Sequence, residues 1–418
     1  MLGDTLWATA NEGATLLSSL ATFFVLTRSL GPLEYGFYAG IQALTGTLFG
    51  FSALWVVMLL LERATRDGRS LATVFAGALS LAGGGAMVTV LIAVLAGPRF
   101  LPDVPMATIV TFAVAELVGN TVLTVVAATV QVGRGYAAGA VVRTATVLPR
   151  FVSVIGLYLL DRVDLGTLGV WQMVISLVLS LLLLVGTSRQ LGLPLRLARP
   201  RLRDLRDGFP YAGVLATFRL QEDADKALLV RLGPPGVAGL YAAAYRIASL
   251  SQLPIQALVS ASHQRFLVDT PGVRREHVER TLRYTVPALA YSVVAMVGIF
   301  VLAPLVGRLL GPEYTDAVPI LRALAPLALL RSLSLFGFNS LMGLGRNRDR
   351  LLIVVVSSAV NVVANLALIP AHSWRGSVAA TALAEVVFIA GTWGAVVRGQ
   401  RSRDAAVDDA QRLDGHAP

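Results

Sequence analysis

The chain has 418 residues, of which 55% are hydrophobic and 14% are charged, and its mean hydropathy is +0.70. A composition this apolar excludes an ordinary soluble protein and indicates an integral membrane protein. Cysteine is absent, which excludes disulfides, thiolate nucleophiles and cysteine-ligated metals. The four histidines lie far apart in or beside expected loops, so we predict neither a metal site nor a cofactor.

Hydropathy predicts about twelve membrane-spanning helices, because a bilayer core requires about 20 apolar residues per helix. In chain order they are expected at residues 5–27, 36–61, 71–96, 106–131, 137–160, 165–186, 210–231, 238–262, 284–306, 317–343, 351–370 and 376–397. No gap between them is long enough for a soluble domain of the usual size. The predicted fold class is therefore an all-α polytopic membrane protein that acts within the bilayer.

The net charge of +10 is distributed unevenly along this series of spans. The gaps after even-numbered spans, together with the tail, hold 22 arginines, whereas the gaps after odd-numbered spans hold six, one in each. By the positive-inside rule, both termini are expected in the cytoplasm. The basic charge is then explained by topology, and nucleic-acid binding is not expected.

A short motif recurs after half of the spans. Residues 26–39, LTRSLGPLEYGFYA, join the first two spans, and residues 229–242, LVRLGPPGVAGLYA, join the seventh and eighth, with the motif's Arg and Tyr offset by 203 positions. This repeat predicts two six-span units in parallel orientation, related by an axis along the membrane normal. We expect six-helix lobes at 1–189 and 210–400, a cytoplasmic linker at 190–209 and a disordered cytoplasmic tail at 401–418.

The seventh span carries ionisable side chains inside an apolar helix. Arg219, Glu222, Asp223 and Lys226 recur at spacings of three and four and therefore share one face. Because ionisable groups at membrane depth are costly and usually face a bundle interior or a water-filled cavity, we favour a hydrated cavity. Structural ion pairs between packed helices are the alternative interpretation.

Two motifs in this span have known chemistry in other settings. Lys226 is the only lysine and follows Asp-Ala-Asp rather than a glycine-rich turn, so we predict no phosphate-binding loop and no ATP hydrolysis. Asp223 and Asp225 match the D-x-D of metal-dependent glycosyltransferases, but alternate positions on a helix point about 160–200° apart. We therefore expect that their carboxylates do not converge on one ion.

Other spans also contain polar side chains at membrane depth. The eighth span has Arg246 at the edge of a polar stripe, and this stripe is expected to face the seventh helix if the two form a hairpin; it consists of Tyr245, Ser249, Gln252 and Gln256. Isolated candidates elsewhere are Asn11, Glu12, Glu116, Asn120, Arg143, Arg150, Arg322, Arg331 and Glu385. Arg150 and Glu385 could belong to inter-helix pairs, and Arg322 could reach the outer interface.

Three stretches, in this order, carry a resemblance to a known family. They are LTRSLGPLEYGFYAG near the start, DKALLVRLGPPGVAGLYAAAYRI in the middle and LLGPEYTDAVPILRALAP from Leu309. On a twelve-span frame with a repeat after the sixth span, the chain resembles polysaccharide-export and O-antigen flippase members of the multidrug/oligosaccharidyl-lipid/polysaccharide exporter (MOP) superfamily, over roughly residues 5–397. The resemblance implies two six-helix lobes around a central cavity that opens alternately to each leaflet.

The resemblance also implies which residues line this cavity. In the family, the first, second, seventh and eighth spans line it, and basic residues contact the anionic head group of the substrate. Carried over by position, the substrate-binding candidates are Arg28 at the outer mouth, Arg219, Lys226 and Arg246, with Gln252 from the polar stripe. Candidate coupling or cavity carboxylates are Asp225, Glu222, Asp223 and Glu116. On the seventh span, three acidic residues accompany the two bases. This differs from the family pattern, so a strongly cationic lumen is not implied.

The predicted function is transport without covalent chemistry, so the chain is not expected to be an enzyme. The resemblance implies that it flips a polyprenyl-pyrophosphate-linked oligosaccharide from the inner to the outer leaflet of a bacterial inner membrane. Expected partners are this substrate, membrane lipid and the glycan polymerase or glycosyltransferase machinery. A drug/cation antiporter of the same superfamily is the alternative. A ligase- or polymerase-type membrane enzyme is disfavoured, since those resemble proteins with a sizeable outward-facing loop.

Overall fold

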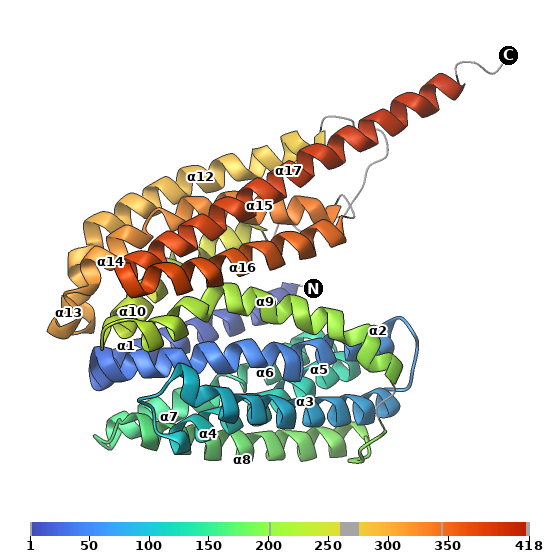
Figure 1. Ribbon diagram of the computed structural model, residues 1–418. Coiled ribbons are helices and arrows are strands. Elements are labelled where there is room, and N and C mark those ends of the chain that lie inside the picture. The colour runs from blue at the N-terminus through green and yellow to red at the C-terminus, as the bar shows by residue number, and fades with distance from the viewer. Residues whose placement is uncertain (1, 200–201, 260–275, 344–345, 415–418) are drawn as a thin grey trace. The chain divides into compact units, whose positions relative to one another are not determined.

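The computed structural model describes residues 2–199, 202–259, 276–343 and 346–414. Every element in these ranges is helical, and the chain divides into two compact units (Figure 1). Unit 1 comprises Met1–Gly239 and Leu309–Glu313, and unit 2 comprises Leu240–Arg308 and Tyr314–Pro418. The predicted all-α class is confirmed.

Unit 1 contains the first part of the helix series. Its elements are α1 (Leu2–Phe49), η1 (Gly50–Leu54), α2 (Trp55–Thr65), α3 (Leu71–Phe100), α4 (Met106–Ala113), η2 (Val114–Gly119), α5 (Asn120–Arg134), α6 (Tyr136–Thr144), α7 (Leu148–Leu159), α8 (Leu165–Leu191) and α9 (Leu202–Leu232). Two of these, η1 and η2, are π-helical turns that interrupt longer α-helices. Such turns are frequent at functional sites.

Unit 2 contains the remaining helices. They are α10 (Val237–Leu250), which begins in unit 1, α12 (Glu276–Leu302), η3 (Ala303–Leu305), α13 (Val306–Leu310), η4 (Pro312–Tyr314), α14 (Ala317–Leu324), α15 (Leu327–Gly343), α16 (Asn347–His372) and α17 (Trp374–Asp414). Residues 253–259 are also helical.

Nine helical runs in the described ranges are long and apolar enough to cross a membrane. The first, Gly13–Thr65, covers residues 13–27 of the first predicted span and all of the second, and the other eight coincide with spans three to six and nine to twelve. Helices α9 and α10 occupy the places of spans seven and eight; α9 lacks an uninterrupted apolar run because of its charged residues. The chain is thus a multi-pass membrane protein, consistent with about twelve spans.

A kink separates the first two spans. Gly31 has φ 66° and ψ 175°, a conformation that glycine adopts readily because it has no Cβ. Pro32 follows and lacks the N–H that would continue the helical hydrogen bonding. The repeated Leu-Gly-Pro motif therefore turns the chain from one span into the next.

Two predicted boundaries differ from the structure. Helix α17 continues through residue 401, where the cytoplasmic tail is predicted to begin, as far as Asp414. The alanines, arginines and glutamine of this stretch favour a helix, and no glycine or proline interrupts them. Residues 415–418 lie outside the described ranges. In the linker, α9 already begins at Leu202, eight residues before the predicted span.

The compact units divide after Gly239 rather than within residues 190–209, because α9 packs against α1, η1 and α2 in unit 1. A Cβ on Gly50 would lie 2.9 Å from the amide nitrogen of Ala216, and one on Gly36 would lie 2.8 Å from that of Gly239. Glycine thus permits close backbone approach along this contact. The six-helix lobes inferred from the repeat stay a prediction.

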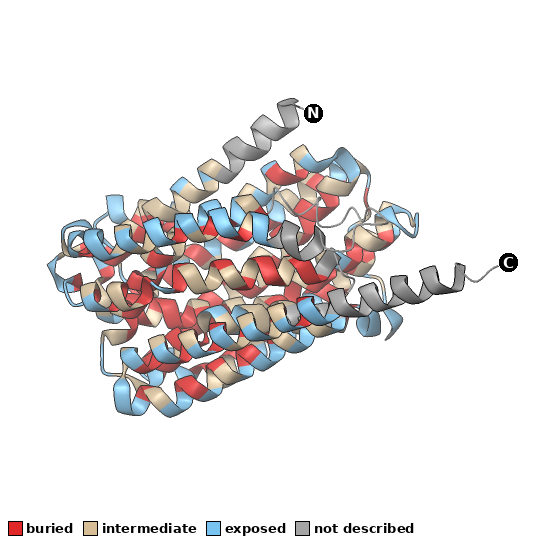
Figure 2. Cartoon of the chain, turned by 90° about the horizontal axis from the view of Figure 1, so that it is seen from above, coloured by how far each residue is buried: buried red, intermediate tan, exposed pale blue. Residues whose placement is uncertain are grey.

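Buried residues follow one side of most helices and exposed residues the other (Figure 2). At the start of α8 the carboxylate of Asp164 caps the helix by accepting a hydrogen bond from the amide of Thr167 at 2.9 Å. Burial acts to raise the pKa of Asp164, but the hydrogen bonds from Thr167 outweigh it and hold that pKa below its usual range.

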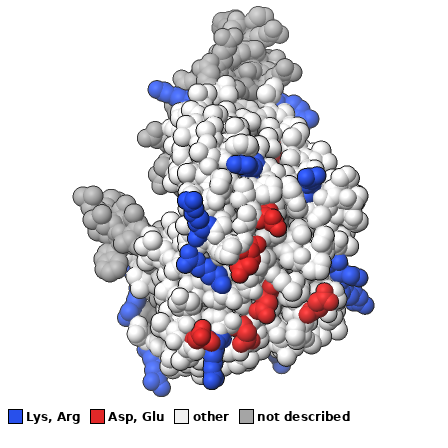
Figure 3. All heavy atoms as spheres, turned by 90° about the vertical axis from the view of Figure 1, so that its left-hand side faces the viewer, with Lys and Arg blue, Asp and Glu red and all other residues white. Residues whose placement is uncertain are grey.

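Acidic and basic side chains both occur on the end of the molecule where α13 lies (Figure 3). This end includes gaps after odd-numbered spans, in which exposed acids such as Glu313 and Asp316 accompany single arginines such as Arg308. The described surface drawn in this view is therefore mixed in charge.

Candidate functional site

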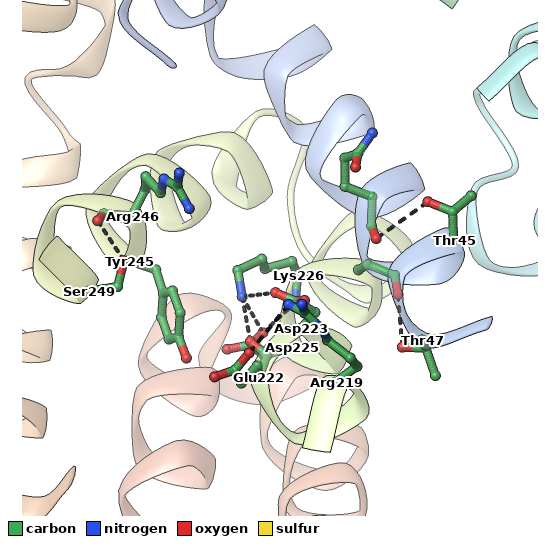
Figure 4. A network of polar contacts seen from close by, with 12 residues as sticks. Thr45, Thr47, Arg219, Glu222, Asp223, Asp225, Lys226, Tyr245, Arg246 and Ser249 are labelled. Atoms are coloured by element: carbon green, nitrogen blue, oxygen red, sulfur yellow. Dashed lines mark hydrogen bonds and ion pairs between the residues drawn. The ribbon is translucent and has the colours of Figure 1, made fainter. Parts of the chain in front are cut away.

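The buried part of the charged face on α9 is organised around Lys226 (Figure 4). Lys226 is 8% exposed and Asp225 is 1% exposed. The Lys226 Nζ lies 2.8 Å from Asp223 Oδ1 and 3.4 Å from Asp225 Oδ1, and it donates a hydrogen bond to the carbonyl oxygen of Glu222 at 2.5 Å. The ammonium group of the only lysine is thus held by two carboxylates of its own helix.

This arrangement corrects one prediction from the sequence. Asp223 and Asp225 were expected to point apart, yet both contact the same cation. The Asp225 carboxylate turns back along the helix and accepts a hydrogen bond from the amide of Lys226 at 2.8 Å, while the long lysine side chain reaches between the two acids. Helix geometry fixes the direction of each Cα–Cβ bond, but the side-chain torsions decide where the charged groups meet.

The other end of this face is exposed. Arg219 Nη1 lies 3.7 Å from Glu222 Oε2, and both side chains are 51% exposed. A pair this exposed contributes little to stability. Because both side chains are exposed, their charges are accessible to a ligand. The charged face therefore consists of a buried, neutralised part and an exposed part with both signs.

Arg28 on α1 is tied to the backbone of another segment of unit 1. Its Nε donates a hydrogen bond to the carbonyl oxygen of Leu309 at 2.9 Å. Leu309–Glu313 is the short segment that belongs to unit 1 although its neighbours in sequence belong to unit 2. Arg28, the candidate substrate-binding residue at the outer mouth, thus also holds the Leu309–Glu313 segment against α1.

On α10, Arg246 and Gln252 have different environments. Arg246 is exposed and forms no ion pair with a described residue, and its carbonyl oxygen accepts a hydrogen bond from Ser249 Oγ at 2.7 Å (Figure 4). Gln252 is 3% exposed, and its Oε1 has no hydrogen-bond partner in the described part of the chain. Gln252 lines a cavity of about 10 Å³ in unit 2 together with Tyr245, Ser249 and Arg331.

Glu116 lies in the π-helical turn η2 at the centre of a buried network in unit 1. The carboxylate accepts hydrogen bonds from Arg150 Nη2 at 2.7 Å, Gln172 Nε2 at 2.6 Å and Asn120 Nδ2 at 2.6 Å. Arg150 Nη2 also donates to Gln42 Oε1 at 2.5 Å. Three helices, α5, α7 and α8, therefore donate to this carboxylate, and Gln42 of α1 is linked to it only through Arg150. The sequence nominated Glu116 and Arg150 but did not pair them.

A second buried pair lies in unit 2. Arg331 Nε is 3.3 Å from Glu385 Oε1, and Ser334 Oγ donates to Glu385 Oε2 at 3.0 Å. Arg331 Nη2 also donates a hydrogen bond to the hydroxyl of Tyr245, over whose ring its guanidinium lies at 5.3 Å from the centroid. Arg150 and Glu385 are thus both members of inter-helix pairs, as the sequence suggested they could be.

The sequence analysis did not single out four buried polar side chains on α16 and α17. Asn361, Asn365, Ser377 and Thr381 are all at most 4% exposed. Each has a side-chain atom without a hydrogen-bond partner among the described residues, and Asn365 Nδ2 donates to Asn361 Oδ1 at 3.1 Å. Ordered water commonly satisfies such groups. The recurrence of Asn and Ser/Thr at spacings of four within two spans was the signal available in the sequence.

Among the described residues, no group of three or more His, Asp or Glu side chains could hold a metal ion. The nine candidate residues also do not form one contiguous site within either unit: those on α1, η2 and α9 belong to unit 1, whereas Arg246 and Gln252 belong to unit 2.

Solved structures share this fold. No family model matches the sequence, and no curated protein matches it. An inward-facing multidrug resistance MATE family transporter of the MOP superfamily is 16% identical, with a TM-score of 0.68 over 93% of this chain and 96% of its own. The lipid II flippase MurJ in an inward closed conformation is 11% identical, with a TM-score of 0.73 over 94% and 89%.

A third structure, a MOP superfamily transporter from Pyrococcus furiosus, is 16% identical, with a TM-score of 0.56 over 94% of this chain and 95% of its own. Because nearly the whole of each chain is covered, the likeness extends over both units. The chain therefore has the fold shared by MATE and MurJ transporters.

Proposed function

We propose that this chain is a transporter of the MOP superfamily that flips a polyprenyl-pyrophosphate-linked oligosaccharide from the inner to the outer leaflet of a bacterial inner membrane by alternating access. The fold shared with a MATE transporter and with the lipid II flippase MurJ supports the transport class. The three sequence stretches that resemble polysaccharide exporters support the substrate class. Glycosyltransferases that build the substrate and a polymerase that consumes it are the corresponding partners.

One observation carries the choice of an anionic substrate: within the predicted spans, the carboxylates whose side chains the structure describes lie beside bases. Glu12 of the first predicted span lies outside the described side chains. Glu116 is 2.7 Å from Arg150, Glu385 is 3.3 Å from Arg331, Asp223 and Asp225 are 2.8 and 3.4 Å from Lys226, and Glu222 is 3.7 Å from Arg219. Arg246, in contrast, is exposed without an ion pair among the described residues.

This distribution of charge favours an anionic ligand over a cationic drug. A cationic drug requires a carboxylate that is not already neutralised by the protein, because a second cation would have to displace the first. A pyrophosphate requires accessible cations, and an exposed guanidinium can bind two phosphate oxygens through charge-assisted hydrogen bonds. Arg246, which has no ion pair among the described residues, meets that requirement.

A drug/cation antiporter is the second candidate, and the exposed half of the α9 face favours it. Glu222 is 51% exposed and only loosely paired with Arg219 at 3.7 Å. In that case Glu222 would bind the coupling cation, and loss of its charge would abolish drug efflux. A flippase would instead depend on Arg219 and Arg246.

The proposal predicts that Arg246→Ala abolishes export of the lipid-linked oligosaccharide while the protein still accumulates. Arg246→Lys should restore part of the activity, because a point charge remains but the bidentate geometry is lost. The measurement is lipid-linked glycan accumulated on the cytoplasmic leaflet of cells that carry each variant in place of the wild type. Arg375→Ala is the matched control, since Arg375 is an exposed arginine beside Trp374 outside the predicted path.

Normal export by Arg246→Ala at wild-type abundance would remove Arg246 from the substrate path. Drug efflux by the purified protein in vesicles, lost in Glu222→Gln and without any movement of lipid-linked glycan, would establish the antiporter instead.

A further inference from the structure

Two of the predicted spans in unit 2, the eighth and the tenth, are interrupted by a short turn. Helix α10 ends at Leu250, two residues before the helix resumes, and α14 ends at Leu324, two residues before α15 begins. Pro254 and Pro326 lie at these breaks and lack the N–H that would bond to the carbonyl four residues earlier. Non-helical backbone at membrane depth is tolerated where it is buried in protein or lines a cavity, and discontinuous helices often form the binding sites of transporters.

Both breaks line the same cavity of about 10 Å³. Ser249 and Gln252 belong to the break in the eighth span, and Ala325 belongs to the break in the tenth. Tyr245 and Arg331 complete the polar part of the lining. A cavity of this volume holds about one water molecule or one hydroxyl group.

The lining defines what the occupant of the cavity must be. Gln252 is 3% exposed, and its Oε1 has no hydrogen-bond partner among the described residues, so the occupant must donate a hydrogen bond. An anion has no proton to donate, and Arg331 already lies 3.3 Å from Glu385. A cation would be repelled by Arg331. A neutral hydroxyl group, which both donates and accepts hydrogen bonds, meets these requirements.

The polar lining of the cavity continues to Arg246, the exposed arginine of the proposed pyrophosphate site. Ser249 Oγ donates to the carbonyl oxygen of Arg246 at 2.7 Å, and Ser249 is half-buried (Figure 4). Three residues of an α-helix extend about 4.5 Å along its axis, so Ser249 lies about one turn beyond Arg246. In the proposed substrate, the sugar joined directly to the pyrophosphate is the nearest source of hydroxyl groups.

We propose that the cavity is a subsite for one hydroxyl group of this first sugar, and that Gln252 makes the transporter selective for that hydroxyl. The hydroxyl donates its hydrogen bond to Gln252 Oε1, and a water molecule takes its place when no substrate is bound. The identity of the ligand rests on the proposed function. A sugar that lacks the hydroxyl leaves the buried Gln252 Oε1 without a donor, which weakens binding by about 10- to 100-fold.

The test measures equilibrium binding to the purified full-length protein. The probes are polyprenyl pyrophosphate linked to glucose, galactose or N-acetylglucosamine, followed by the monodeoxy forms of whichever probe binds most tightly. For the wild type, one monodeoxy form should bind about 10- to 100-fold more weakly than its parent, whereas the other forms should bind like the parent. Equal affinity for the parent and all of its monodeoxy forms would show that the cavity holds water only, and would overturn the proposal.

Gln252→Met provides the complementary measurement, because methionine has a similar length but offers no strong acceptor. This variant should bind the parent and the discriminated deoxy form with equal affinity. Gln256→Met is the matched control, since Gln256 is exposed four residues further along and does not line the cavity; it should discriminate like the wild type. If Gln252→Met does not accumulate, the shorter Gln252→Asn should also lose the discrimination. Discrimination that persists without Gln252, or that is lost in Gln256→Met, would contradict the assignment.

Movement of the same probes between the leaflets of proteoliposomes separates this inference from the proposed function. Binding that depends on one hydroxyl, without any movement of lipid, would refute the flippase and leave the subsite standing. Movement of the parent and of every monodeoxy form at the same rate and with the same affinity would refute the subsite and leave the flippase standing.

Discussion

In unit 1, three hydrogen bonds offset the free-energy cost of placing the Glu116 charge at membrane depth. Its donors come from α5, α7 and α8, and the residue itself sits in the π-helical turn η2. Ser176 and Ser180 of α8 also donate hydrogen bonds to the carbonyl oxygens of Ala115 and Gly119, at 2.9 and 3.0 Å. The extra residue of a π turn disturbs the regular backbone bonds, so α8 completes both the side-chain and the backbone bonding.

Replacing Arg150 with Ala should therefore destabilise unit 1. The change leaves the Glu116 carboxylate without its counter-ion, and loss of one partner of a buried pair costs several kcal/mol. Because the Arg150 side chain keeps 36% exposure, we expect a smaller effect, on the order of 2–3 kcal/mol. Thermal unfolding of the protein in detergent, followed by loss of monodisperse material, measures the change.

The double variant Arg150→Ala, Glu116→Gln should recover much of that loss, since the uncompensated charge is gone while Asn120 and Gln172 can still bond to the amide. A double variant no more stable than Arg150→Ala would mean that Arg150 stabilises the unit through packing or through Gln42 rather than through Glu116.

The sequence predicted which ionisable side chains lie inside the protein, but it predicted their contacts poorly. The rule that charges inside spans are rare and purposeful selected Glu116, Arg150, Arg331 and Glu385. The contacts Glu116–Arg150 and Arg331–Glu385 join residues 34 and 54 positions apart, which only the packing of helices decides. The convergence of Asp223 and Asp225 on Lys226 depends on side-chain torsions, which spacing along a helix does not define.

Helix α9 is held along unit 1 by close contacts at glycines and by a cluster of charges near its start. Besides the approach of Gly50 to Ala216, a Cβ on Gly208 would lie 2.1 Å from the ring of Trp55. Beside that contact, the 10% exposed side chain of Arg63 on α2 lies 3.1 Å from Asp204 and 2.7 Å from Asp207 of α9. These two features explain why α9 packs with unit 1 although the repeat assigns it to the second half.

Arg63→Ala should loosen the attachment of α9 to α2. The change leaves Asp204, at 18% exposure, without its cation, whereas Asp207 is 42% exposed and remains hydrated. We expect a loss of about 1–3 kcal/mol and faster proteolysis of the 190–209 segment. Both are measured on the purified protein.

Arg203→Ala is the matched control, because Arg203 is 78% exposed and 3.7 Å from the same Asp207. An exposed pair of this kind contributes less than about 1 kcal/mol. Equal effects of the two substitutions would show that the cluster does not anchor α9.

At the scale of elements, hydropathy located most spans to within a few residues, because the requirement for about 20 apolar residues is strict. The prediction from hydropathy was least accurate at the ends of helices. The early start of α9 at Leu202 and the continuation of α17 to Asp414 both lie in polar sequence, where helix formation depends on propensity rather than on the bilayer.

The orientation of the whole chain stays a prediction from the arginine distribution, and the absence of cysteine makes it directly testable. Single cysteines at Pro102 and Asp316, which are exposed in gaps after odd-numbered spans, should react with an impermeant thiol reagent in intact cells. Cysteines at Arg66 and Arg348, exposed in gaps after even-numbered spans, should react only after the cells are opened. The reverse pattern would invert the topology and place both termini outside.

The burial of Lys226 has a practical consequence for following this molecule in motion. The chain contains one lysine and no cysteine, and the lysine side chain is 10% exposed and held by two carboxylates. The described surface therefore offers neither a thiol nor an accessible lysine amine. One introduced lysine on unit 1 and one introduced cysteine on unit 2 would each be the sole exposed side chain of its chemistry. A donor and an acceptor dye can then be attached orthogonally, and energy transfer between them would report the motion of one unit against the other.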